Sequence, residues 1–265
     1  MRKLILRIFL TLLTILCNFG WSQIEQPYPP LNLVSIPTAG TLPRGSFTLE
    51  TLLINNGGIV PRLSVGFTDN FSFGVSFGVQ NLIGGNKPSI NKTTPEVQIK
   101  YRVFDESEKM PALVYGLDNQ GRGLYHVTDS VFTLNRYDQK AWGMYMVMSK
   151  NWNLLGNLGL HAGINKSLSE NSDGDNDINV FIGIDKELNR SFSLLVEFDA
   201  ALNDDGDIEY PIDDAFGRGR GYLNVGIRWA MSSNLMLEIN FNDINQNTNS
   251  EYTNREIKVM YSESF

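Results

Sequence analysis

Residues 254–265, at the end of the chain, read NREIKVMYSESF. Apolar side chains stand at every second position, at Ile257, Val259 and Tyr261, and the last residue is the aromatic Phe265. Successive side chains of a β-strand point to opposite faces, so this spacing predicts a strand with one apolar face. The chain therefore ends in a strand that closes on an aromatic residue.

Such a terminal strand has two interpretations. It is typical of the signal by which the barrel-assembly machinery recognises outer-membrane β-barrels, and on this interpretation the signal consists of Phe265, Tyr261, Val259 and Ile257. In a soluble protein the same residues would form an edge strand tucked against the core. The choice between them depends on the rest of the sequence.

The N-terminus predicts export. Residues 1–22 begin with Arg2, Lys3 and Arg7, continue through an apolar run at 8–17, and end near small residues, which is the pattern of a cleaved signal peptide. The apolar run is shorter than the about 20 residues that a membrane-spanning helix needs. The one cysteine, Cys17, lies in this segment, so the mature chain is expected to have neither disulfides nor thiolate metal sites.

Alternation with period two continues over nearly the whole mature chain and predicts an all-β protein. We count about 12 strands, most of them near the length of about 9–11 residues that a tilted strand needs to cross a bilayer. They are 46–54, 58–67, 71–80, 95–104, 110–118, 139–149, 157–166, 178–187, 191–201, 221–231, 234–242 and 254–264. We expect residues 23–45 to be a periplasmic segment and residues 46–265 to be one antiparallel barrel.

The lengths of the connections support a membrane barrel. Connections after even-numbered strands are short, as at 68–70 and 188–190, whereas most of those after odd-numbered strands are long, as at 81–94, 119–138, 167–177 and 202–219. Short periplasmic turns opposite longer external loops are the pattern of outer-membrane barrels. The connection 55–57 is a short exception, and the strand register near it is open.

Composition excludes one class of partner. The formal net charge is −7, which leaves no surplus of Lys and Arg to replace the counterions of a nucleic acid. The mature length of about 240 residues suits a single all-β barrel. Outer-membrane lipid and lipopolysaccharide are therefore the expected partners, and no cofactor is predicted.

Alternation alone does not say which face of the barrel is apolar. The polar set is rich in glycine, aromatic residues stand near strand ends, and the chain is exported, which together favour an apolar exterior in contact with lipid. The predicted location is the bacterial outer membrane. On this interpretation a mixed-charge lumen is lined by Lys100, Arg102, His161, Glu197, Asp199, Arg228, Glu238 and Lys258.

Several short motifs resemble the YjbH-like outer-membrane barrels that are associated with exopolysaccharide. They are PTAGTLPRGSF at 37–47, FGVQNLIG at 77–84, IKYR at 99–102, NQG at 119–121, SKN at 149–151 and HAGIN at 161–165. The resemblance extends over most of the mature chain. It implies a barrel with a role in polysaccharide export or envelope assembly, and it carries no catalytic residues to transfer.

An outer-membrane hydrolase is the rival class. It would need a nucleophile and a base within hydrogen-bond distance. The chain has two histidines, His126 in a long predicted loop three residues before Asp129, and His161 in a predicted strand without the His-x-Ser-Asn-Gly arrangement of outer-membrane phospholipases. We expect no enzymatic activity.

One loop has the composition of a calcium site. Asp173, Asp175 and Asp177 alternate with other residues, but Ile178 holds the position where an EF-hand needs glycine. The alternative is a solvated acidic loop, and we predict no resident metal. With the other acidic stretches at 204–207 and 213–214, these residues could bridge lipopolysaccharide through divalent cations.

Two functions remain open at this point. The first is a narrow channel or envelope component associated with exopolysaccharide, in which Lys100, Arg102 and Arg228 face Glu197, Asp199 and Glu238 across the lumen. The second is a closed structural or adhesion barrel that acts through its external loops. A lumen in which the charges pair would be sealed.

Overall fold

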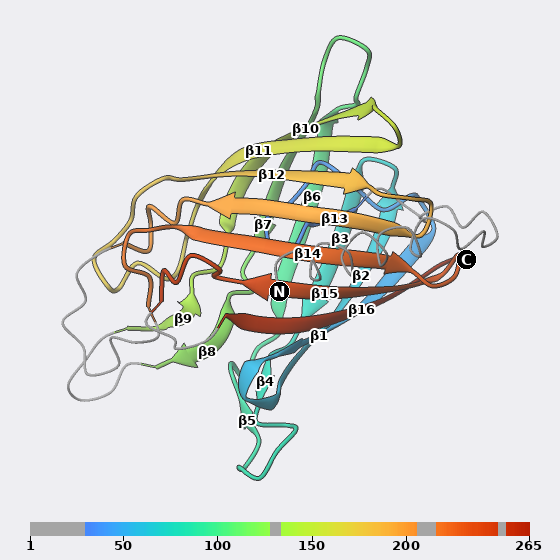
Figure 1. The fold of residues 1–265 in the computed structure, drawn as a ribbon. Helices are drawn as coiled ribbons and strands as arrows, with labels where there is room; N and C mark the ends of the chain where they lie inside the picture. The colour runs from blue at the N-terminus through green and yellow to red at the C-terminus, as the bar shows by residue number, and fades with distance from the viewer. Residues whose placement is uncertain (1–29, 128–133, 206–215, 249–252) are drawn as a thin grey trace, which may run out of the picture.

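The computed structural model describes residues 30–127, 134–205, 216–248 and 253–265, so the predicted signal peptide lies outside the described residues. Twelve long strands form one antiparallel ring, which closes because β1 pairs with both β16 and β2. The fold is the expected all-β barrel (Figure 1). The long strands are β1 (Ser46–Ile54), β2 (Gly58–Thr68), β3 (Phe71–Ser76), β6 (Glu96–Phe104), β7 (Ala112–Asp118), β10 (Gly143–Asn153), β11 (Asn157–Lys166), β12 (Asn179–Glu187), β13 (Phe192–Asp199), β14 (Tyr222–Ala230), β15 (Leu235–Asn242) and β16 (Asn254–Ser264).

Two predicted strands differ from the structure. The segment expected at 71–80 breaks after Ser76 and resumes as β4 (Val79–Gln80), which pairs with β2 and with β5 (Ser89–Ile90). The strand expected at 139–149 begins four residues later, at Gly143, because Gln139 ends a separate hairpin of β8 (Arg122–His126) and β9 (Arg136–Gln139). A 3-10 turn, η1 (Asn55–Gly57), joins β1 to β2.

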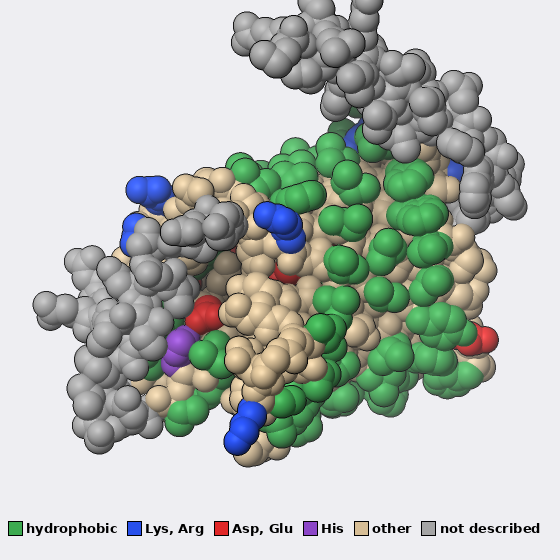
Figure 2. Space-filling model, turned by 60° about the horizontal axis from the view of Figure 1, so that its bottom comes forward, with side chains coloured by type: hydrophobic (Ala, Val, Ile, Leu, Met, Phe, Trp, Pro, Cys, Tyr) green, Lys and Arg blue, Asp and Glu red, His purple; other side chains and the backbone are tan. Residues whose placement is uncertain are grey.

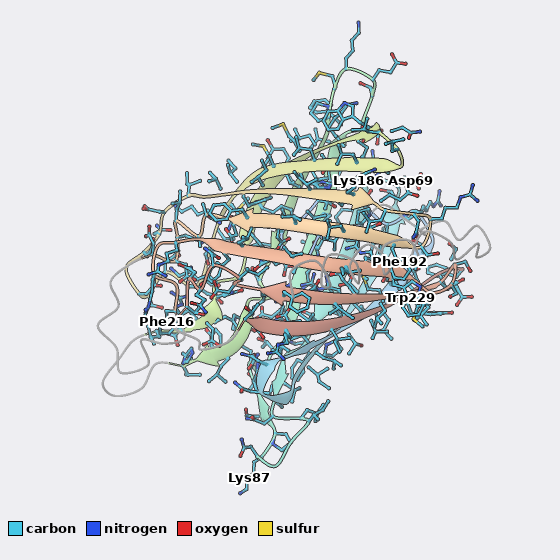
Figure 3. The ribbon with its side chains drawn as sticks, viewed as in Figure 1. Asp69, Lys87, Lys186, Phe192, Phe216 and Trp229 are labelled. Atoms are coloured by element: carbon cyan, nitrogen blue, oxygen red, sulfur yellow. The ribbon has the colours of Figure 1, made fainter. Side chains whose placement is uncertain are left out.

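The connections at the two ends of the barrel differ in length, with the three-residue connection Asn55–Gly57 as the exception. The turns at 69–70, 105–111, 154–156, 188–191 and 231–234 are at the end that carries the C-terminus, and we call it the short-turn end. The longer connections, including the β8–β9 hairpin, are at the other end, which we call the long-loop end. In Figure 3, Phe192 and Trp229 lie toward the short-turn end and Phe216 toward the long-loop end.

The barrel is polar inside and apolar outside. Interior-facing positions of the strands are filled by buried polar side chains such as Gln98, Asn165, Asn224 and Asn240. The alternate positions carry exposed Leu, Ile, Val, Met and Tyr, and these cover the wall in Figure 2. Lipid is the solvent that suits such an exterior, and a closed ring leaves no unpaired strand edge inside it. The chain is a transmembrane β-barrel of the bacterial outer membrane.

Aromatic side chains gather near the short-turn end. Phe47 lies 6.3 Å from both Tyr261 and Phe265 between ring centroids, and Phe192 stacks on Trp229 at 5.7 Å. Such rings favour the interface between lipid and water. The backbone N–H of the terminal Phe265 donates to Gly45 O, and its side chain is exposed. The role of this residue in insertion stays a prediction.

The segment before β1 lies inside the barrel, which corrects the expectation of a segment outside it. All residues from 31 to 42 are buried except the half-buried Asn32 and Ser35, and we call this stretch the plug. It folds back on itself, because Leu33 N–H donates to Ile36 O and Thr38 N–H donates to Leu31 O. Figure 1 draws the plug in blue behind β12 and β13.

Candidate functional site

The plug enters and leaves the lumen at the short-turn end. Leu31 and Leu42, at its two ends, pack together against Ala230, Met236 and Met260, which lie on β14, β15 and β16. The turn between them, residues 33–36, reaches farther toward the long-loop end. The plug is therefore a hairpin-like loop that is inserted from one side of the barrel.

Apolar side chains of the plug fit an apolar patch on the inner wall. Leu33, Val34, Ile36 and Ala39 pack against wall residues on β7, β10, β12 and β13. These wall residues are Ala112, Val114, Tyr145, Val147, Phe181 and Leu195. Burying this apolar surface stabilises the plug inside a lumen that is otherwise polar.

Two glycines in the wall make room for the plug. A Cβ atom at Gly183 would lie 2.4 Å from Leu33 Cδ1 and 2.5 Å from Ile36 Cδ1. A Cβ atom at Gly226 would lie 2.9 Å from Val34 Cγ2. Side chains of the plug therefore rest directly on the backbone of β12 and β14.

One carboxylate holds the turn of the plug. Glu197, on β13, accepts hydrogen bonds from the backbone N–H groups of Val34 at 3.0 Å, Ser35 at 2.9 Å and Ile36 at 3.1 Å. The Ser35 hydroxyl donates to the same carboxylate, as does Asn224 Nδ2 at 2.8 Å. Bonds from several donors to a buried anion are stronger than bonds between neutral groups, so Glu197 fixes the turn in place.

Cations of the wall donate to the carbonyl groups of the plug. Lys258 Nζ lies 3.2 Å from both Leu33 O and Val34 O, and Arg228 Nη2 lies 2.9 Å from Asn32 O. Glu238 is fully buried and pairs with both cations at 2.8 Å. This buried triad has two cations for one carboxylate, and its cations satisfy the backbone oxygens of the plug.

The predicted lumen residues are not paired as expected. Arg228 and Glu238 are direct partners on neighbouring strands, not groups that face each other across an open lumen. Lys100 Nζ donates to Leu31 O, to Thr38 O at 3.1 Å and to Gly40 O at 3.4 Å. The physical reason is that the plug brings unpaired backbone oxygens into the lumen, and the nearest cations satisfy them.

Two more of the predicted lumen residues, Arg102 and Asp199, lie away from the turn of the plug. Arg102 is near the short-turn end, where Nε pairs with Asp105 at 2.9 Å and Nη2 donates to Asp69 O. Asp199, near the long-loop end of β13, accepts from Asn179 Nδ2 at 2.6 Å and from Ala201 N–H at 3.1 Å. Neither contacts the plug through a hydrogen bond within the described part of the chain.

His161 belongs to a buried chain of three side chains. Ser149 Oγ lies 2.6 Å from His161 Nδ1, and His161 Nε2 lies 2.7 Å from Asp185 Oδ1. The order resembles that of a hydrolase triad. However, Ser149 Oγ also accepts a hydrogen bond from Ala39 N–H of the plug at 2.8 Å, so the plug contacts the hydroxyl directly. The group anchors the plug.

The β8–β9 hairpin lies at the long-loop end and contacts both the plug and the wall. Arg122, on β8, pairs with Glu256 at 2.7 Å and donates to Val34 O at 2.7 Å. It links the hairpin to the turn of the plug. Gly123 O accepts from Gln80 and Asn91, which ties β8 to the connection that contains β4. The sequence pattern predicted a loop at 119–138 and gave no indication of this hairpin.

The predicted calcium loop is occupied by protein cations. Asp173 pairs with Arg136 at 2.7 Å and with Lys140 at 2.7 Å, and Arg136 also pairs with Asp204. Burial is the largest influence on Asp204 and raises its pKa, against the opposing effect of Arg136. Among the described residues, no group of three or more His, Cys, Asp or Glu side chains could hold a metal ion. The described helices include none that could span a membrane.

The signal that could have revealed the plug is a local excess of apolar residues. Residues 112–117 and 144–148 are apolar on both faces of their strands, unlike the alternating strands around them. A strand that is apolar on both faces is buried on both faces. In a membrane barrel this indicates something apolar inside the lumen.

Comparisons with known proteins identify similar barrels but no family. No protein-family model matches the chain, and no curated protein matches it in sequence. Solved outer-membrane barrels are similar at low identity. They include the KdgM porin (9% identity, TM-score 0.46, 83% of this chain and 99% of that chain), the NanC porin (8%, 0.43, 83% and 99%) and an outer-membrane channel from Pseudomonas putida F1 (12%, 0.38, 85% and 97%). The chain is thus similar to porins and channels of the outer membrane.

Proposed function

We propose that this protein is a non-enzymatic outer-membrane channel whose lumen is closed, in the present state, by its own N-terminal plug. The observation that carries this proposal is that hydrogen bonds with polar side chains of the inner wall hold the plug in the lumen. Every bond between plug and wall is non-covalent, and the polar groups that hold it would line a hydrated passage if the plug withdrew. A barrel of 12 strands is wider than one filled by its own side chains alone.

The resemblance to YjbH-like barrels supports a finer proposal. The channel would serve a process associated with exopolysaccharide, and polysaccharide would be a partner of the lumen or of the external loops. Passage of a polar polymer needs hydrogen-bonding groups along the wall, and Gln98, Asn165, Asn224 and Asn240 supply them on the inner face.

A closed structural or adhesion barrel is the second candidate, and a specific observation favours it. The turn of the plug is held by several strands at once, because Lys258 on β16 and Arg122 on β8 both donate to Val34 O while Glu197 on β13 accepts from its N–H. A segment fixed in this way could stay in place permanently. The loops, with their mixed charges, would then carry the interaction.

A reducible tether distinguishes these functions. Ala39 N lies 2.8 Å from Ser149 Oγ, so the two residues are neighbours, and the double variant Ala39→Cys/Ser149→Cys is designed to link the plug to β10 by a disulfide in a mature chain expected to contain no other cysteine. Loss of free thiol on oxidation checks that the disulfide has formed. In planar bilayers we expect no conductance with the tether formed and conductance steps after reduction. The two single variants and a variant lacking residues 31–41 are the controls.

Two other outcomes would reject the proposed plugged channel. Equal conductance with and without the tether would show that the plug does not close the channel. A folded, heat-modifiable barrel that stays silent after reduction, and also without residues 31–41, would be a structural barrel.

A further inference from the structure

We propose that Arg218, Arg220 and Arg255 bind the phosphate groups of lipopolysaccharide at the rim of the long-loop end. We call these three residues the arginine patch. The inference concerns the outer surface of the barrel, so it holds whether or not the lumen opens. It is carried by three exposed arginines that have no ion-pair partner among the described residues, in a chain whose net charge is −7.

Arg255 lies where the apolar wall ends. It is the second residue of β16, and its exposed side chain is in phase with the exposed Ile257 and out of phase with the buried Glu256, so it points to the outside of the barrel. Strand pairing places it beside the exposed Phe241 of β15. In Figure 2, several Lys and Arg side chains lie where the green wall gives way to the loops. Lipid headgroups lie at this level of a membrane barrel.

Arg218 and Arg220 lie farther out on the same part of the rim. Arg255 is level with Val225 in the register of β14, β15 and β16, and both other arginines precede Val225. Their backbone N–H groups donate to Asn247 Oδ1 at 3.1 Å and 2.7 Å. Asn247 is fully buried and belongs to the connection between β15 and β16. The loop before β14 is therefore fixed to the connection that leads to Arg255, and β14 and β16 are two strand spacings apart, about 10 Å.

The guanidinium groups of the patch have no acidic partner in the part of the chain that the structure describes. Arg220 Nη1 lies 3.5 Å from Gln246 O, which is a long hydrogen bond. Asp205 lies beside Gly219, which separates Arg218 from Arg220, yet it forms no ion pair with either arginine. Cations that share one part of a surface without a counter-ion repel one another, and a bound anion removes this repulsion.

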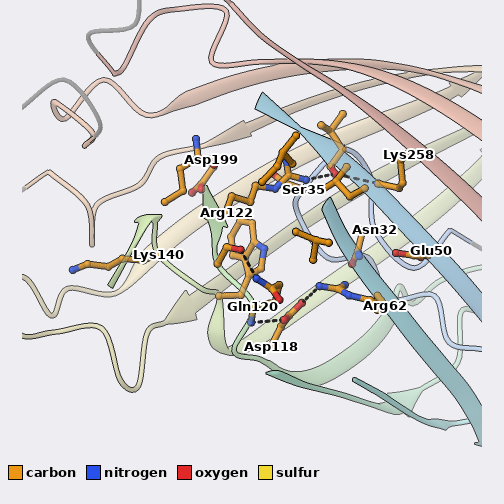
Figure 4. Close-up of a pocket in the computed structure, with 17 residues that line it drawn as sticks. Asn32, Ser35, Glu50, Arg62, Asp118, Gln120, Arg122, Lys140, Asp199 and Lys258 are labelled. Atoms are coloured by element: carbon orange, nitrogen blue, oxygen red, sulfur yellow. Dashed lines mark hydrogen bonds and ion pairs between the residues drawn. The ribbon is translucent and has the colours of Figure 1, made fainter. Parts of the chain in front are cut away.

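The arginines inside the barrel differ in this respect. The cavity beside the turn of the plug has a volume of about 70 Å³, which is room for a few water molecules. Its arginines are already paired, Arg62 with Asp118 at 3.0 Å (Figure 4) and Arg122 with Glu256 at 2.7 Å. Among the described residues of the long-loop end, the arginines available to an anion are those of the patch.

A phosphorylated lipid suits the patch better than a free anion. A guanidinium group binds phosphate through two parallel hydrogen bonds, and both partners are charged. The outer wall below Arg255 carries the exposed Ile257 and Val259, so acyl chains can pack on the wall while the headgroup reaches the arginines. A free phosphate ion would gain the polar contacts alone. The patch therefore fits the phosphorylated lipid of the outer leaflet, which is lipopolysaccharide.

Binding is measured on the full mature chain in detergent, by native mass spectrometry, with lipid A that carries two phosphates and with the same lipid after removal of both. We expect the phosphorylated form to bind at least about tenfold more tightly, a difference of about 1.4 kcal/mol. Equal binding of the two forms would show that the acyl chains alone bind, and would overturn the proposal. Competition by millimolar inorganic phosphate would assign the patch to a free anion and would overturn it as well.

A triple variant tests the patch itself. Arg218→Gln/Arg220→Gln/Arg255→Gln should bind the two forms of lipid A about equally, because the phosphates lose their charged partners. A preference that persists in this variant would place the phosphate site elsewhere and reject the patch. Heat-modified migration in electrophoresis checks that the variant is folded, and the comparison of the two lipids on the unaltered chain decides the proposal even if it is not.

The matched control removes the same number of charges from exposed positions at the short-turn end. It is the triple variant Arg44→Gln/Lys109→Gln/Arg190→Gln, and it should keep the preference for the phosphorylated lipid. An equal loss of preference in both triple variants would show an effect of net charge and not of a site, which would contradict the proposal.

Discussion

Glu197 is a single buried residue that holds the turn of the plug inside the lumen. Its carboxylate is 1% exposed and accepts bonds from three successive backbone N–H groups of the plug. The turn of residues 33–36 presents these donors because it folds back on itself. Without an anion at this place, the N–H groups would lie in the lumen unpaired, at a cost of about 1–3 kcal/mol each.

We expect Glu197→Gln to loosen the plug while leaving the barrel folded. The NH₂ group of the glutamine would face the backbone N–H groups of the turn, which are also donors, so the turn should open more often. Exchange of the amide hydrogens at 33–36 should then rise by about tenfold or more. Hydrogen exchange followed by mass spectrometry measures this. Glu187→Gln is the control, because Glu187 accepts from Asn157 N–H near the short-turn end. Equal exchange in both variants would contradict the assigned role.

The external loops form an element of their own at the long-loop end. Glu170, in the connection between β11 and β12, is buried and accepts a hydrogen bond from Ala141 N–H at 2.7 Å. Burial is the largest influence on it and raises its pKa to about 7, against the opposing effects of Ala141 and Lys92. The loops therefore hold a carboxyl group that gains a proton close to neutral pH.

The pH dependence of the loops follows from this shift. The folded protein binds the proton of Glu170 more tightly than the unfolded chain, so stability is full below about pH 4.5 and is lost as pH rises through about 7. We expect Glu170→Gln to have a higher melting temperature than the wild type at about pH 8 and a similar one at about pH 4. An equal difference in melting temperature at both pH values would contradict this expectation. Glu108→Gln, in the exposed turn 105–111 at the short-turn end, serves as the control.

At the scale of the whole molecule, the barrel places its apolar side chains outside. Ile182, in the middle of β12, is 47% exposed on the outer wall, and Leu188, just after the same strand, is 58% exposed. In water these two positions would tolerate charge equally. In a membrane they differ, because the cost of a cation is greatest at the middle of the bilayer.

Arginine substitutions should therefore depend on depth. Ile182→Arg should destabilise the barrel by about 2–4 kcal/mol and Leu188→Arg by about 0–1 kcal/mol, measured by reversible unfolding in lipid vesicles. Similar small effects at both positions would show that the outer wall does not face lipid. Leu188→Arg is the matched control, since it places the same cation just after the same strand.

The sequence by itself determined the barrel and its strands. Alternation with period two depends only on neighbouring residues, so the strands from β11 to β16 agree with the prediction to within about two residues. The parity of the loops followed in the same way. The strand predicted at 139–149 was displaced because the pairing of β9 with β8 depends on residues before a long connection.

Only the tertiary structure decided what the lumen contains. The plug has no periodicity that distinguishes it from an extended leader, and its place depends on distant partners such as Glu197 on β13 and Lys258 on β16. The same charged residues would line an open channel if nothing entered it. The alternation of the charged residues showed which side of each strand they occupy. Their partners were determined by the plug, which is far from them in sequence, because buried carbonyl and amide groups must find hydrogen-bond partners among the groups that the fold brings near.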